Sequence, residues 1–71
     1  MEQTYEITIE EHLDLRWQEW LYGMDFTYLP GGETRLRGAL PDQTALYGLL
    51  ERMRDLNLTL VALVRVTTTH S

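Results

Sequence analysis

The chain has 71 residues, enough for one small domain but not for two. Hydrophobic residues make up 44% and charged residues 24% of it, as in ordinary folded domains, so an extensively disordered chain is excluded. The 11 acidic and 6 basic residues give a net charge of −5. We therefore expect no nucleic-acid partner, because a basic excess is needed to bind phosphates. The absence of cysteine excludes disulfides, thiolate metal sites and a cysteine nucleophile.

Residues 58–66 form the longest strongly apolar stretch, about half of what a membrane-spanning helix needs. The first residues lack the basic and apolar parts of a signal peptide. We therefore expect a cytoplasmic protein with no membrane partner. The whole of residues 1–71 is expected to be one domain, with residues 67–71 as a frayed tail.

Residues 5–10 alternate between apolar and polar side chains, which is typical of a half-buried strand. The apolar face carries Tyr5, Ile7 and Ile9, and the polar face carries Glu6, Thr8 and Glu10.

The period changes over residues 12–23. Leu13, Trp17, Trp20 and Leu21 form one helical stripe here. Asp14 suits the N-cap of such a helix, and Gly23 suits the left-handed position after its end. A short helix is therefore expected, with a loop over residues 14–22 left open as the alternative.

Two strands at residues 24–29 and 33–40 flank Pro30-Gly31-Gly32, which predicts a hairpin. On the second strand Arg35 and Arg37 share one face, opposite Leu36 and Leu40. Gly38 indicates a bulge or a close approach of another segment.

The clearest helix begins after Asp42, a good N-cap, and ends near Asn57, a residue that tolerates the left-handed conformation. Its apolar stripe consists of Leu46, Leu49, Leu50 and Met53. Residues 58–66 then predict a final strand that is apolar on both faces. One face is expected to carry Leu58, Leu60, Ala62, Val64 and Val66, and the other Val61 and Leu63, with Thr59 and Arg65 at its ends.

The order strand, helix, strand, strand, helix, strand predicts the α+β class with a ferredoxin-like β-α-β-β-α-β sandwich. In that fold a four-stranded antiparallel sheet has both helices on one face, strands one and three in the centre and strands two and four at the edges. If the first helix collapses into a loop, a β-β-β-α-β sheet results. On the helix-free sheet face, Glu6 and Glu10 are expected to lie opposite Arg35 and Arg37, because opposite charges on adjacent strands attract.

The final strand should be an edge, yet it is apolar on both faces and has no proline or lysine. Isolated edge strands are usually protected by charges, bulges or proline. The sequence therefore predicts a homo-oligomer, most simply a dimer, with Thr59, Val61, Leu63 and Arg65 at the interface. The alternative is that Val61 and Leu63 are scattered surface apolar residues, which are common.

No catalytic, metal or cofactor site is predicted. His12 lies among acidic residues, but the spacing is not that of a metal site, and a turn histidine is the simpler interpretation. The aromatic residues Trp17, Trp20 and Tyr22 fit core packing or an interface better than a ligand pocket.

Two segments of the chain resemble a family of short uncharacterised bacterial proteins of about this length. The first contains His12-Leu13-Asp14, Arg16-Trp17 and Trp20. The second contains Asp42-Gln43, Leu46, Gly48-Leu49-Leu50, Arg52, Arg54-Asp55-Leu56 and Leu58. The resemblance covers residues 5–65, with Tyr47 at a position where the family commonly has histidine. It implies a bacterial cytoplasmic protein of unknown function and no specific activity.

The sequence thus predicts a non-enzymatic, self-associating interaction module. A dimeric α+β barrel with a ligand or enzymatic site on the open sheet face is one alternative. An adaptor that docks a larger protein through Trp17, Trp20 and Tyr22 is another.

Overall fold

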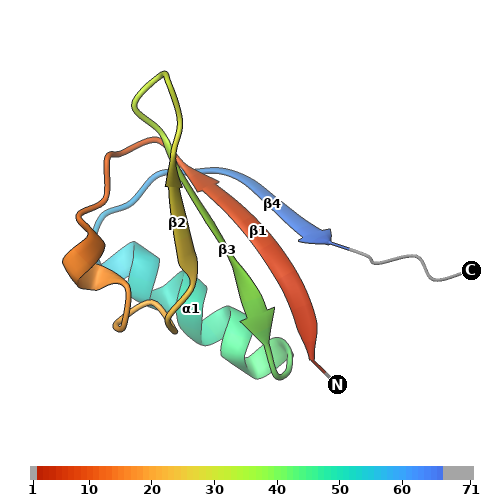
Figure 1. The fold of residues 1–71 in the computed structure, drawn as a ribbon. Helices are drawn as coiled ribbons and strands as arrows, with labels where there is room; N and C mark the ends of the chain where they lie inside the picture. The colour runs from red at the N-terminus through yellow and green to blue at the C-terminus, as the bar shows by residue number, and fades with distance from the viewer. Residues whose placement is uncertain (1, 67–71) are drawn as a thin grey trace, which may run out of the picture.

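The computed structural model describes residues 2–66, so the expected tail at 67–71 lies outside the described residues. In chain order the elements are β1 (Gln3–Ile9), the 3-10 turn η1 (Leu15–Trp17), β2 (Asp25–Tyr28), β3 (Thr34–Leu40), α1 (Gln43–Asp55) and β4 (Leu60–Val66). Figure 1 shows one sheet with α1 on one of its faces and β4 at the edge away from the helix.

The four strands are ordered β2-β3-β1-β4, and every neighbouring pair is antiparallel. β1 and β3 are therefore central, and β2 and β4 are edges. On the helix side Ile7 pairs with Leu36, which in turn pairs with Phe26 of β2. Ile7 and Leu36 are both completely buried, so the core lies between this face and α1.

The expected ferredoxin-like fold with two helices is wrong, because the described residues contain a single α-helix. The structure has instead the β-β-β-α-β order that follows when the first helix is lost. The segment that should form this helix contains only the three-residue turn η1, with Asp14 capping it through a hydrogen bond from the Arg16 N–H. Tyr22 and Gly23, with φ values of 63° and 67°, end the following turns.

Buried Thr34 of β3 explains why the chain does not become helical directly after β1. Its hydroxyl accepts a hydrogen bond from the Leu13 N–H at 3.0 Å and donates one to the Glu11 carbonyl at 2.8 Å. These bonds hold residues 11–13, which have no regular secondary structure, against the sheet. A helix this short has little stability of its own, so such tertiary bonds decide its conformation.

The loop between β1 and β2 fills the core in place of the missing helix. Leu21 is completely buried and Met24 is 2% exposed, whereas Trp20, which shares the predicted stripe, is 44% exposed. Met24 lies directly over Gly38, where an added Cβ would come within 3.1 Å of the Met24 Cγ. Gly38 therefore marks a close approach, one of the two interpretations that the sequence offered.

Helix α1 begins and ends where the sequence indicates. Asp42 accepts a hydrogen bond from the Ala45 N–H at 2.8 Å at the N-cap. At the other end Asn57 has a φ of 59°. The Asn57 N–H donates a hydrogen bond to the Arg54 carbonyl, and the Leu58 N–H donates one to the Met53 carbonyl. This is a Schellman C-cap, which satisfies the last carbonyl groups of a helix. The helix packs most closely against β3. The buried core consists of Tyr5, Ile7, Ile9, Leu13, Leu21, Met24, Leu36, Leu40, Leu46, Leu49 and Met53.

Candidate functional site

Strand β4 contains a bulge that determines which way its side chains point. Thr8 pairs with Ala62 and Ile9 pairs with Leu60, so Val61 is an extra residue with no partner in β1. Such a bulge exchanges the two faces for all later residues of the strand. Leu63 pairs with buried Ile7 and so lies on the helix side, whereas Val64 pairs with Glu6 on the open side.

This bulge corrects the predicted division of the final strand. Leu60 and Leu63 were expected on opposite faces, but both pair with buried residues of the helix face, Ile9 and Ile7. Val64 was expected to share a face with Leu60 but lies on the opposite one, together with Ala62 and Val66. A single-residue bulge is set by local pairing, so alternation of residue types along the strand does not reveal it.

Strand β4 is exposed on both faces. Leu60, Val61, Leu63 and Val64 retain 48%, 50%, 39% and 52% of their accessible surface. No described residue pairs with the outer edge of the strand, and α1 does not extend far enough to cover it (Figure 1). An edge strand with exposed apolar residues on both faces is typical of an interaction site.

The two ends of the expected interface segment are placed differently. Thr59 precedes the strand and is bound to Glu11, whose carboxylate oxygens accept from the Thr59 N–H at 2.8 Å and its hydroxyl at 2.7 Å. These hydrogen bonds lower the pKa of Glu11 below its ordinary value, and the bond from the Thr59 backbone has the larger effect. Arg65 lies inside the strand, opposite Tyr5, and is exposed.

The open sheet face carries a small ion-pair cluster next to β4. Glu6 contacts Arg37, its direct partner, at 3.2 Å and Arg35, its diagonal neighbour, at 3.7 Å. Glu10 does not join them, because β1 ends at Ile9 and the Glu10 N–H donates to the Thr59 carbonyl instead. One acid paired with two arginines is a structural arrangement rather than an acid–base pair.

The aromatic residues expected as a partner anchor already have contacts within the chain. The guanidinium carbon of Arg52 lies 4.5 Å from the ring centre of Trp20 and 4.8 Å from that of Tyr22, and its Nη1 donates to the Trp20 carbonyl at 2.7 Å. Trp17 is partly buried against the core, with Arg16 over its ring at 5.4 Å. Trp20 and Tyr22 therefore attach the β1–β2 loop to α1 through Arg52.

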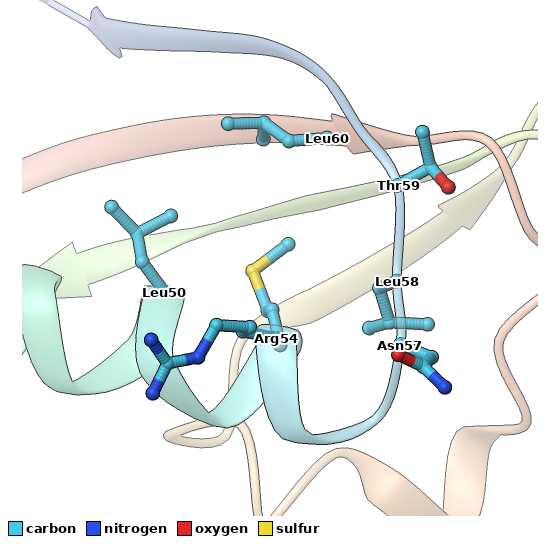
Figure 2. Close-up of a pocket in the computed structure, with 7 residues that line it drawn as sticks. Leu50, Arg54, Asn57, Leu58, Thr59 and Leu60 are labelled. Carbon is cyan, nitrogen blue, oxygen red and sulfur yellow. The ribbon is translucent and has the colours of Figure 1, made fainter.

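A groove opens between α1 and the start of β4 on the helix side of the sheet. It has a volume of about 420 Å³ and is lined by Leu50, Met53, Arg54, Asn57, Leu58, Thr59 and Leu60. Figure 2 shows Leu50 on the helix and Leu60 on the strand bordering this space, with Leu58 at the turn between them. The sequence analysis missed this groove, because residue spacing does not show how far the helix lies from the edge strand.

The acidic and histidine residues among residues 2–66 are spread along the chain rather than gathered at one site. No three of the described His, Asp and Glu residues are grouped to hold a metal ion. His12 stacks on Tyr28 with ring centres 4.3 Å apart and an interplanar angle of 10°.

Among the described helices, none has the length and apolar character needed to cross a membrane.

The chain was compared with known proteins and families. Neither the curated proteins nor the solved structures gave a match. A family model described as "Domain of unknown function (DUF8691)" matches residues 4–64, which include the helix and all four strands apart from the first residue of β1 and the last two of β4. The chain therefore belongs to this family of unknown function.

Proposed function

We propose that this protein is a non-enzymatic interaction module that associates with a second copy of itself through β4. The observation that carries the proposal is the exposed edge of this strand, with four large apolar side chains between 39% and 52% exposed. Within the described strand, Arg65 is the single charged residue. Monomeric proteins usually protect such an edge, because it can pair with another strand.

A second copy is the occupant that fits this edge best. Pairing of β4 with β4 of the partner subunit about a two-fold axis is self-complementary, since each copy supplies the same apolar edge strand. It extends the four-stranded antiparallel sheet to eight strands and covers the exposed β4 edge of each copy. The exposed side chains of Leu63 and Val64 then contact apolar neighbours on both faces.

The opposite edge of the sheet offers a weaker site. Strand β2 has four residues and begins with the charged Asp25, whereas β4 has seven. The open sheet face is also less suitable, because its centre carries the charged cluster of Glu6, Arg35 and Arg37. Removing these charges from water against a partner would cost more than pairing the apolar edge.

The test replaces Val64 by lysine. Lysine is a residue that natural edge strands use against pairing, and at this position it faces Glu6 within the same chain, so the monomer itself should keep its fold. The matched control is Tyr47→Lys on α1, where the side chain is 63% exposed and lies outside β4. We expect Val64→Lys to be monomeric by light scattering while Tyr47→Lys keeps the wild-type mass.

A wild-type mass equal to that of the monomer would contradict the proposal, as would a Val64→Lys variant that still forms the wild-type assembly. Each copy carries a net charge of −5, so association should strengthen as salt screens the repulsion between copies.

A bacterial origin and a cytoplasmic location are part of the same proposal. A chain without cysteine does not need an oxidising compartment for disulfides.

A further inference from the structure

We propose that the groove between α1 and β4 binds a small amphipathic anion, such as a medium-chain carboxylate, with its apolar part against Leu50, Leu58 and Leu60 and its charged group at Arg54. This inference goes beyond self-association. All the residues that line the groove belong to one chain, so binding does not require a dimer.

The size and lining of the groove fit such a ligand. Its volume of about 420 Å³ lies within the range of roughly 300–1,000 Å³ that small-molecule sites occupy. Small-molecule sites combine apolar walls with a few polar groups that orient the ligand. Here the apolar walls come from both α1 and β4, and the polar groups are Arg54, Asn57 and Thr59.

The polar groups differ in what they can offer. The Thr59 N–H and hydroxyl are both bound to Glu11. The side chains of Arg54 and Asn57 make no hydrogen bond with a described residue, and Arg54 forms no ion pair within residues 2–66. Arg54 is exposed, and Figure 2 shows its side chain lying along the helix at the border of the groove. It can therefore bind an anionic group without breaking a described contact.

The end of α1 does not oppose an anion here. A helix C-terminus carries roughly half a negative charge, less than the full positive charge of Arg54. The carbonyls of Arg52, Met53 and Arg54 also accept hydrogen bonds from residues 56–58 in the C-cap. Arg54 is the charged residue among those that line the groove, and the neighbouring Glu11 carboxylate has both oxygens bound to Thr59. Arg54 therefore favours a carboxylate over a cationic group at its end of the groove.

Titration with decanoate below its micelle concentration, followed by NMR of the methyl groups, tests the inference. We expect saturable shifts of the Leu50, Leu58 and Leu60 methyl groups in the wild type and equally in the monomeric Val64→Lys variant. Arg54→Gln should weaken decanoate binding about fivefold, as expected for the loss of one exposed charge contact. The control Arg16→Gln removes the same charge beside Trp17 and should leave decanoate affinity unchanged.

The uncharged analogue decanol separates the two parts of the site. It should bind the wild type and Arg54→Gln with the same affinity, because it lacks the carboxylate. Three results would overturn the inference: no saturable shift in the groove, equal decanoate affinity of Arg54→Gln and wild type, or shifts confined to Val64 and Ala62 on the open face. A wild-type protein that is monomeric at every concentration but keeps the groove shifts would contradict the proposed function alone.

Discussion

Glu11, just after β1, holds Thr59, just before β4, with both oxygens of its carboxylate. The backbone N–H of Thr59 lies 2.8 Å from Oε1, and its hydroxyl lies 2.7 Å from Oε2. The Glu10 N–H also donates to the Thr59 carbonyl at 3.0 Å. These bonds fix the position at which the edge strand begins and so align the exposed residues of β4 with β1.

The Glu11–Thr59 contact predicts an acid-sensitive fold. The pKa of Glu11 is lower in the folded chain than in the unfolded chain. The Glu11 carboxylate therefore contributes fully to stability at pH values above the unfolded-state pKa. This contribution is lost as the pH falls through the lowered pKa of the folded state. Glu11→Gln should therefore be less stable than the wild type at pH 7 and approach it in strongly acidic buffer. Urea unfolding at both pH values measures this, and a stability difference independent of pH would contradict it.

Arg52 should contribute to stability through the aromatic residues of the β1–β2 loop. Arg52→Gln removes the contacts with Trp20 and Tyr22 and the bond to the Trp20 carbonyl. We expect a loss of about 1–3 kcal/mol in the free energy of unfolding. Arg16→Gln removes a single, longer ring contact and should cost about 0.5 kcal/mol. Equal losses in the two variants would show that the Arg52 cluster has no special role.

Gly48 and Tyr22 should be energetically coupled. An added Cβ at Gly48 would lie 2.6 Å from the Tyr22 hydroxyl oxygen, while alanine in a helix is favoured over glycine by about 1 kcal/mol. In the wild type, Gly48→Ala should therefore raise the free energy of unfolding only slightly. Combined with Tyr22→Phe, which removes the hydroxyl, it should raise the free energy of unfolding by close to 1 kcal/mol. A double-mutant cycle by urea unfolding measures the coupling, and strictly additive effects would contradict the contact.

Thr34 should be sensitive to an isosteric change. Thr34→Val keeps the volume but removes the hydroxyl that bonds the Leu13 N–H and the Glu11 carbonyl. Leaving these buried groups without partners should cost about 2–3 kcal/mol. Thr8→Val on the open face, where Thr8 makes no side-chain hydrogen bond with residues 2–66, should change stability by less than about 0.5 kcal/mol. A Thr34→Val variant as stable as Thr8→Val would contradict this account of the loop.

Helix α1 could be predicted from the sequence because its signals are local. Asp42 caps it, Leu46, Leu49 and Met53 are buried on one stripe, and Asn57 ends it. The helix expected at residues 12–23 was wrong because its fate depends on a distant residue. Thr34 binds residues 11 and 13 to the sheet, and the stripe is divided between a buried Leu21 and an exposed Trp20.

The exposed edge could be predicted in part. The sequence shows that residues 58–66 are apolar on both faces, and the structure leaves Leu60, Val61, Leu63 and Val64 exposed. The face that each residue occupies could not be predicted, because the unpaired Val61 shifts the register by one residue. The groove beside Arg54 could not be predicted either, because it depends on the distance between α1 and β4 rather than on any pattern within them.

The mass of the wild-type protein in solution tests the central claim most directly. Light scattering after size exclusion, over a dilution series and at low and moderate salt, measures this mass without any substitution. The proposed pairing of β4 predicts twice the chain mass at high concentration, with dissociation on dilution and stronger association at moderate salt. A monomer at every concentration and salt would contradict it and leave the edge of β4 for a different protein.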